Sequence, residues 1–264
     1  MVGTGIDEER LRHRQGPVRM RDGIPYSDSA TTLSLLPGAA MGRWMAAQQH
    51  HVRGRLLDAG CGNQPFRDWY APLAEEVICL DAAPLPGVDV VGFADRLPFA
   101  DASFDTLMVT EVLEHVGDAE VAVAEIHRVL RPGGHALITV PYLYPTHEAP
   151  YDFRRFTHFG LSAILERHGL EVVTLDAKGG GVLLVAHLFV LALVAGLDAV
   201  SSKLDSPNLL TDNRALRRLL ATPQESAGRR LRAASGVRGS ATRASLGYMA
   251  VARRPGSPAP SAAP

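Results

Sequence analysis

Short apolar runs alternate with longer amphipathic stretches through the central part of the chain. The apolar runs predict strands over residues 55–58, 76–80, 88–92, 106–110, 135–140 and 171–175. Apolar residues at helical spacing, bounded by capping residues and glycines, predict helices over 36–49, 65–71, 118–130 and 157–169. Strands separated by helices favour right-handed crossovers and a mostly parallel sheet covered on both faces. We therefore expect an α/β fold.

The two ends of the chain and one internal segment depart from this alternation. Residues 1–30 are polar and weakly patterned, which predicts a flexible arm before a domain over 31–254. Within that domain, residues 179–240 carry a glycine-led apolar run and an arginine-rich stretch, and we expect a helical insertion there. A last strand is predicted over 246–252. The proline-, alanine- and serine-rich residues 255–264 predict a disordered tail.

Composition narrows the class of protein only slightly. A length of 264 residues suits one large domain, and a net charge of −1 gives no drive toward nucleic acid. Two cysteines and a polar start favour a reducing compartment without a signal peptide, so we expect a cytoplasmic protein. The apolar run at 182–197 is marginal for a membrane span. A buried or substrate-covering helix pair is the favoured interpretation, with peripheral membrane contact through 179–240 as the alternative.

A tight glycine turn follows the first predicted strand, in the stretch Leu57-Asp58-Ala59-Gly60-Cys61-Gly62. Glycines have no Cβ and tolerate positive φ, so the backbone can pass close beneath a ligand. The helix expected after the turn offers unpaired N–H groups to the polar end of that ligand. Pro65 stands where the third glycine of a dinucleotide loop would fall. The turn therefore predicts a nucleotide-type ligand without deciding which one.

Acidic residues follow the carboxyl ends of four predicted strands, namely Asp58, Asp81, Asp95 and Glu111. Because the carboxyl ends of parallel strands meet at one edge of a sheet, we expect these side chains on one rim. One carboxylate can accept hydrogen bonds from both hydroxyls of a ribose, which suits Asp81. Asp95 could accept a hydrogen bond from an adenine amine, and Asp58 favours an ammonium group over a pyrophosphate. A cationic, adenosine-containing ligand without phosphates satisfies all three demands.

Several stretches of the chain, in this order, resemble the class I S-adenosylmethionine-dependent methyltransferases, especially the methyltransferase type 11-like group. They are Leu57–Gly62, Asp95 with Leu97-Pro98-Phe99, Ser103-Phe104-Asp105, Glu111–Val116 and Arg128–Gly134. The resemblance implies S-adenosyl-L-methionine as cofactor and a small-molecule, glycan or lipid-like acceptor. It also implies a Rossmann-like seven-stranded sheet in the order 3-2-1-4-5-7-6, with strand seven antiparallel and helices on both faces.

The resemblance further implies roles for single residues around the cofactor. The glycine loop would run beneath the methionine moiety, with Asp58 near its amino group. Asp81 would hold the ribose, Asp95 would hold the adenine amine, and the end of the fourth strand would flank the methionine. The implied cofactor-binding set is Asp58, Gly60, Cys61, Gly62, Asp81, Asp95, Arg96, Leu97, Thr110 and Glu111.

Aromatic, histidine and acidic residues gather in 141–157, after the fifth predicted strand. A hydroxyl acceptor of a methyl group needs a base, whereas the cofactor already carries the activated carbon. We predict His147 as the base or acceptor ligand, with Glu148 or Asp152 orienting it; a structural lid is the alternative. His115 could contact the acceptor or a metal, or be a structural histidine, and no metal site is predicted.

The favoured function is an enzyme that methylates a small-molecule, glycan or lipid-like acceptor. A non-catalytic S-adenosylmethionine-binding regulatory or partner protein would keep the same pocket without turnover. A nucleic-acid methyltransferase using the arginine-rich insertion is disfavoured. The fourth strand ends in Thr110-Glu111-Val112-Leu113 rather than the Asn/Asp-Pro-Pro-Tyr/Phe of enzymes that act on base amines. Asp58 and the missing third glycine disfavour an NAD-dependent dehydrogenase.

Overall fold

The structure is a computed structural model that describes most of the predicted domain. It covers residues 18–21, 24–27, 35–181, 184–189, 192–193, 196 and 245–256. Most of the insertion predicted at 179–240 and most of the tail predicted at 255–264 therefore lie outside the described residues.

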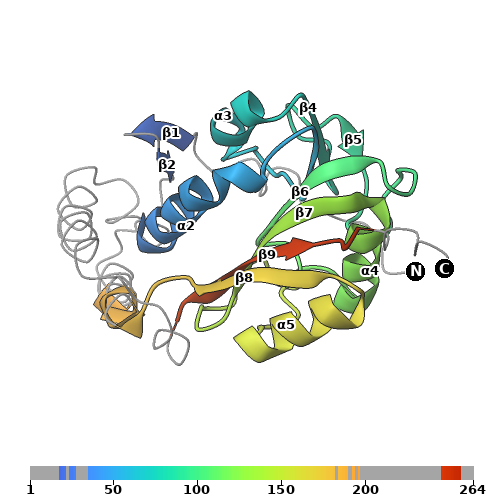
Figure 1. The fold of residues 1–264 in the computed structure, drawn as a ribbon. Coiled ribbons are helices and arrows are strands. Elements are labelled where there is room, and N and C mark those ends of the chain that lie inside the picture. Colours follow the sequence, from blue (N-terminus) through green and yellow to red (C-terminus); the bar gives the residue numbers. More distant parts are fainter. Residues whose placement is uncertain are drawn as a thin grey trace, which may run out of the picture.

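A seven-stranded sheet in the order β5-β4-β3-β6-β7-β9-β8 forms the centre of the molecule (Figure 1). Its strands are β3 (Arg55–Ala59), β4 (Glu76–Asp81), β5 (Val90–Val91), β6 (Phe104–Thr110), β7 (Leu130–Pro141), β8 (Glu171–Ala177) and β9 (Gly247–Arg253). The strands from β5 to β7 are parallel, and β9 runs antiparallel to both of its neighbours. The predicted order, with an antiparallel last strand, is confirmed.

Helices cover both faces of this sheet, α4 and α5 on one side and α2 and α3 on the other (Figure 1). They are α2 (Leu35–Gln48), α3 (Arg67–Tyr70), α4 (Ala119–Val129) and α5 (His158–Arg167), with short 3-10 turns η2 (Gln49–His51) and η3 (Ala71–Leu73). On β6, Leu107 and Val109 pack in the cluster around α4 and α5, whereas Met108 packs with α2 and α3. Burial of both faces explains why the strands read as continuous apolar runs.

Local chemistry sets where the helices begin and end. The Asp118 carboxylate accepts hydrogen bonds from the backbone N–H groups of Glu120 and Val121 at the start of α4. The Thr157 hydroxyl caps α5 in the same way. The helix predicted over 65–71 is shorter than expected: α3 begins only at Arg67, and after Tyr70 the chain tightens into η3, where Pro72 has no N–H to donate.

Two short strands are described within residues 1–30, the predicted flexible arm; the other residues of that range lie outside the described part of the chain. β1 (Val18–Arg21) and β2 (Ile24–Ser27) pair antiparallel, with Arg21 opposite Ile24, and β2 contacts α2. The sequence between them is Asp22-Gly23, a pair that favours two-residue hairpin turns. Alternation of apolar and charged residues in β1 is the second signal of this hairpin.

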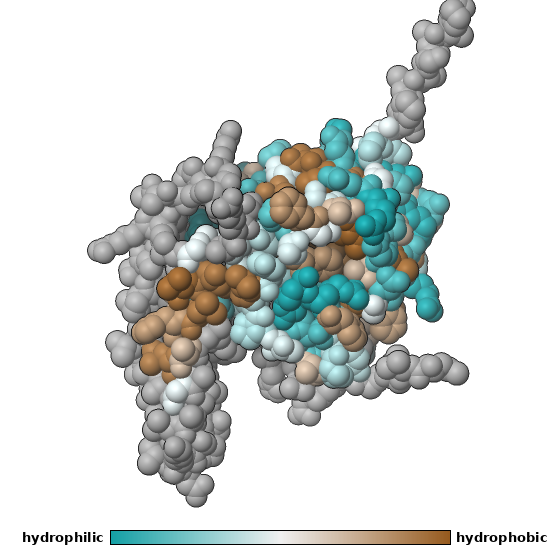
Figure 2. Space-filling view, turned by 90° about the horizontal axis from the view of Figure 1, so that it is seen from below, coloured by the Kyte–Doolittle hydropathy of each residue, from teal (hydrophilic) through white to brown (hydrophobic). Residues whose placement is uncertain are grey.

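Residues 184–189 are the best-described part of the predicted insertion, and they are helical. Leu184 packs with Ala40 of α2 and Leu246 before β9. The outer side of this turn exposes Val185 and Phe189, and Figure 2 shows an apolar patch on this side of the molecule. Among the described residues, no helix combines the length and apolar character needed to cross a membrane.

We expect Asp118→Ala to lower the free energy of unfolding by about 1 kcal/mol, because two N–H groups of α4 lose their acceptor. Asp118→Asn keeps a capping oxygen and serves as the control, with little change expected. Urea unfolding of the three proteins measures the difference. Equal stabilities of the alanine variant and the wild type would contradict the capping role.

Candidate active site

The glycine turn after β3 is held in place by the neighbouring strand. Gly60 and Cys61 donate backbone hydrogen bonds to the carbonyl of Leu80, at 2.8 and 3.0 Å. Gly60 has φ +77°, and a Cβ there would lie 2.4 Å from Cγ2 of Val112. Gly62 also has positive φ, at +51°. The turn therefore requires glycine both for its backbone conformation and for the close approach of Val112.

Asp81 ties this turn to the end of β4. Its Oδ2 accepts a hydrogen bond from the backbone N–H of Gly62 at 2.8 Å, and its Oδ1 accepts one from Ala83 at 3.0 Å. Each carboxylate oxygen has a further lone pair for a ligand hydroxyl. The structure thus places Asp81 at the carboxyl edge of the sheet, as predicted, and adds a structural role for it.

Asp58 lies on β3 beneath the same turn and is only 3% exposed. The Tyr70 hydroxyl donates a 2.6 Å hydrogen bond to its Oδ2, whereas Oδ1 has no hydrogen-bond partner among the described residues. Burial raises the pKa of Asp58 from 3.8 to about 7, against the opposing effect of the Tyr70 hydrogen bond. At neutral pH this side chain is close to the midpoint of its titration.

The predicted adenine segment is anchored to α4. Leu97 is buried, its N–H donates to the Glu125 carboxylate at 2.8 Å, and its carbonyl accepts from the Arg128 guanidinium at 2.9 Å. Asp95 is half-buried and Arg96 is exposed. The structure therefore holds the backbone of this segment firmly and leaves Asp95 at its surface.

Glu111 follows Thr110 at the end of β6 and makes an ion pair with a buried lysine. Its Oε1 accepts hydrogen bonds from Thr139 at 2.7 Å and from Nζ of Lys178 at 2.5 Å. Burial acts to raise the pKa of Glu111, but Lys178 and Thr139 outweigh it and hold that pKa below its ordinary value. Lys178 follows β8 and is only 3% exposed, so this pair links two distant strands across the sheet edge.

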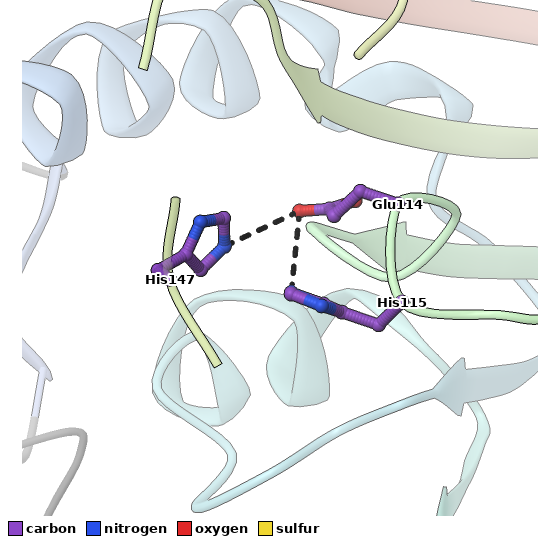
Figure 3. A group of neighbouring side chains, drawn as sticks. All are labelled: Glu114, His115 and His147. Atoms are coloured by element: carbon purple, nitrogen blue, oxygen red, sulfur yellow. Dashed lines mark ion pairs between the residues drawn. The ribbon is translucent and has the colours of Figure 1, made fainter. Parts of the chain in front are cut away.

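Glu114, His115 and His147 come together from two separate segments (Figure 3). Nε2 of His115 and Nε2 of His147 lie 3.6 and 3.8 Å from Oε1 of Glu114. Glu114 is fully buried, and neither of its carboxylate oxygens has a hydrogen-bond partner in the part of the chain that the structure describes. Burial raises the pKa of Glu114 well above its ordinary value, with a further contribution from Glu111.

The loop after β7 places Asp152 beside the His147 ring. Asp152 Oδ2 lies 3.4 Å from Nδ1 of His147 and accepts its backbone N–H at 2.9 Å. Hydrogen bonds from Arg155 lower the pKa of Asp152 to about 2. Burial lowers the pKa of His147, although Asp152 acts in the opposite direction. Glu148 has φ +56°, and its carbonyl accepts the N–H of Tyr151.

Tyr70, Lys178 and Glu114 are site residues that sequence reasoning did not single out. Glu114 carried a signal, because Glu111-Val112-Leu113-Glu114-His115 brings two acids and a histidine into five residues. The position of Lys178 was also a signal, since it follows a predicted strand and should lie on the same sheet edge as the acidic residues. Tyr70 gave none, because its role depends on α3 packing against Asp58.

Comparison with known proteins finds similarity to methyltransferases. Residues 57–138 match the family model described as a methyltransferase domain. A probable S-adenosylmethionine-dependent methyltransferase of Mycolicibacterium smegmatis is 33% identical over 168 residues, covering 53% of this chain and 65% of the relative. A malonyl-[acyl-carrier protein] O-methyltransferase of Serratia marcescens is 32% identical over 108 residues, covering 37% and 42%. The chain therefore spans less than two thirds of the length of these curated relatives.

Solved structures share the fold at low sequence identity. The Burkholderia thailandensis 1,6-didemethyltoxoflavin-N1-methyltransferase, with its substrate and S-adenosylhomocysteine bound, is 18% identical with a TM-score of 0.51. The match covers 82% of this chain and 79% of that one. The [4+2]-cyclase SpnF is 20% identical with a TM-score of 0.51, covering 92% and 87%. At these identities the likeness concerns the fold alone.

The strand order, the glycine turn and the match over residues 57–138 make this part of the chain similar to the class I S-adenosylmethionine-dependent methyltransferases. S-adenosylmethionine is the cofactor of that class. The residues present fit this ligand, because Asp81 offers carboxylate oxygens at the sheet edge and Asp58 places a buried oxygen without a partner, among the residues described, beneath the turn. Asp58 can act on a cation through its field, since 3% exposure leaves little surface for direct contact.

The raised pKa of Asp58 predicts a pH-dependent stability. The folded protein keeps a proton that the unfolded chain loses near the ordinary pKa of 3.8, and this stabilising contribution is lost as pH rises through about 7. Relative to Asp58→Asn, the wild-type free energy of unfolding should fall by about 1.4 kcal/mol per pH unit between about pH 5 and 6.5. Urea unfolding across that range checks it, and parallel slopes for both proteins would exclude the raised pKa.

Proposed function

We propose that the protein transfers the methyl group of S-adenosylmethionine to a small-molecule, glycan or lipid-like acceptor. The observation that carries this proposal is the Asp81 carboxylate, which is fixed by Gly62 and Ala83 at the edge where the glycine turn meets β4. In this position it suits a ribose diol. The Glu114, His115 and His147 cluster beyond β6 then provides polar groups for the acceptor.

On the cofactor side, we assign Asp81 to the ribose and Asp95 to the adenine amine. The glycine turn and the Thr110–Glu111 end of β6 would flank the methionine moiety. Lys178 holds Glu111 through a direct ion pair, which fixes that carboxylate before any ligand binds. Fixed dipoles and charges need no reorganisation when the ligand arrives, and this favours binding in the reactive geometry.

On the acceptor side, we assign His147 as the base or acceptor ligand and Asp152 as its positioning residue. The cofactor supplies a methyl group already activated by its sulfonium. The acceptor atom bonds the methyl carbon as the carbon–sulfur bond breaks, its proton leaves to the base or to water, and S-adenosylhomocysteine is released. Asp152 suits the positioning role because Arg155 holds it and it faces Nδ1 of His147.

Exposed apolar residues on the helical turn that contacts the 141–157 loop support an acceptor that is partly apolar. The Tyr144 ring stacks on His187 with centroids 5.4 Å apart, which joins the 141–157 loop to the helical residues 184–189. That helical turn exposes Val185, Leu188 and Phe189. Relatives are named for methylating a carrier-protein-bound acid and a demethylmenaquinone. These names favour small-molecule or lipid-like acceptors over nucleic acid.

Replacing the proposed ribose ligand should weaken cofactor binding. We expect Asp81→Asn to lower the affinity for S-adenosylhomocysteine by roughly 1–3 kcal/mol, measured by titration calorimetry. Asp89→Asn is the matched control. The Asp89 carboxylate accepts the backbone N–H of Cys79, a residue of β4 like Asp81, at 2.8 Å, but Asp89 lies outside the proposed cofactor set. An equal effect of the two substitutions would reject the assignment.

Turnover separates the proposed enzyme from a non-catalytic cofactor-binding protein. The wild type should release S-adenosylhomocysteine when incubated with S-adenosylmethionine and fractionated small-molecule and lipid extracts. Asp81→Asn should lower that release in proportion to its weaker binding. Tight S-adenosylhomocysteine binding without release from any fraction would favour the regulatory or partner role.

A further inference from the structure

A single group of three side chains in the described part of the chain has the composition and spacing of a metal site. The ligand atoms of Glu114, His115 and His147 all lie within 4.8 Å of one another. Figure 3 shows both imidazole rings directed at the Glu114 carboxylate. We propose that these three side chains bind one divalent transition-metal ion of the zinc type.

The Glu114 carboxylate lacks the partner that its burial requires. Its side chain is fully buried, and among the described residues neither oxygen accepts a hydrogen bond. A buried polar group without a partner is unfavourable, and an ionised one is more so. The backbone N–H of Phe153 donates to the Glu114 backbone carbonyl at 2.9 Å. The neighbouring loop thus gives the Glu114 backbone a hydrogen bond but gives none to its carboxylate. A cation between the carboxylate and the two rings would give Oε1, the oxygen nearest both rings, a partner.

Both histidines are oriented as metal ligands usually are. Nδ1 of His115 lies 3.0 Å from the carbonyl of Tyr151, and Nδ1 of His147 lies 3.3 Å from the carbonyl of Pro145 and 3.4 Å from Asp152. A metal-bound imidazole commonly donates its second N–H to a carbonyl or carboxylate, which fixes the tautomer with Nε2 toward the metal. In both rings Nε2 is the nitrogen that lies near Glu114.

The two segments that carry the ligands are clamped together. The Arg154 guanidinium donates to the carbonyls of Val116 and Gly117 at 2.9 and 2.8 Å. This contact and the Phe153–Glu114 backbone hydrogen bond hold the loop after β7 against the turn after β6. The side chain of His147 is 27% exposed, so an ion can reach the cluster from solvent. The site is thus both fixed and accessible.

The two distances to Glu114 need only a small contraction around an ion. Zinc–nitrogen bonds of about 2.0–2.1 Å in a tetrahedral site place neighbouring ligand atoms roughly 3.3 Å apart. The two nitrogen–oxygen distances to Glu114 are 3.6 and 3.8 Å. Two imidazoles and one carboxylate favour zinc and similar first-row ions over magnesium or calcium, which prefer oxygen ligands.

Three protein ligands leave coordination positions open. The role of these positions rests on the proposed function: they would bind an oxygen of the acceptor and lower the pKa of its hydroxyl. His147 would then act on the acceptor through the ion rather than as a direct base. Binding of the ion itself depends on the three side chains alone.

Metal titration tests the proposal. After treatment with a chelator, the full chain is titrated with Zn²⁺ by calorimetry and with Co²⁺ by visible absorption. We expect one equivalent to bind, and Glu114→Gln and His147→Gln each to weaken binding by at least about 100-fold. His168→Gln is the control. Nε2 of His168 also lies near a glutamate, 2.7 Å from Oε2 of Glu120, but His168 does not belong to the three-residue cluster.

The outcomes separate the metal site from the methyltransferase function. Absence of one-to-one binding, or equal binding by wild type and both cluster variants, overturns the proposal. If Glu114→Gln does not fold, as judged by circular dichroism, His147→Gln in the loop decides alone. S-adenosylhomocysteine titration of the same metal-free samples tests the cofactor site separately: cofactor binding without Zn²⁺ binding rejects only the metal site, and the reverse rejects only the proposed function.

Discussion

The candidate site depends on the register of the central strand. Leu57 of β3 lies opposite Ile78 of β4 and Leu107 of β6. Because side chains alternate across a strand, a shift of one residue would exchange Leu56 and Leu57 between the two packed faces and move Asp58 away from Tyr70. Burial against helices on both faces therefore fixes the register. The register in turn places the N–H of Gly60 at the carbonyl of Leu80, so the cofactor turn is positioned by the packing of the sheet.

Three acidic side chains near the carboxyl edge are stabilised to different degrees. Glu111 has an ammonium partner in Lys178, and Asp58 has a hydroxyl partner in Tyr70. Glu114 has two nearby imidazoles but, among the residues described, no hydrogen bond to either carboxylate oxygen. A buried carboxylate favours a proton or a cation when the protein gives it no partner. At the end of β6, Glu111 therefore has its counter-ion in Lys178, whereas the Glu114 carboxylate next to the loop after β7 has no hydrogen-bond donor among the described residues.

Features of the fold and site could be predicted from the sequence where their signal is local or follows from the order of the strands. The glycine turn and the rim position of Asp81 could be predicted from the residues, because parallel strands place their carboxyl ends together. The strand order was implied by the family resemblance. The pairing of Lys178 with Glu111 could not, since the two residues are 67 positions apart. The partner of His147 is a closer case: Glu148 and Asp152 were equally plausible in sequence, and only the fold of the loop brings Asp152 to Nδ1.

The two halves of the site are built on different kinds of structure. The proposed cofactor groups lie on strand ends that the sheet fixes, whereas the cluster around His147 lies on loops. Loops tolerate change more readily than strands, so acceptor preference can vary while cofactor binding persists. The stack of Tyr144 on His187 extends the loop half to the helical residues 184–189. A substitution in residues 184–189 would therefore alter the loop around His147 more than the position of Asp81, because Asp81 is held by backbone hydrogen bonds from a separate turn.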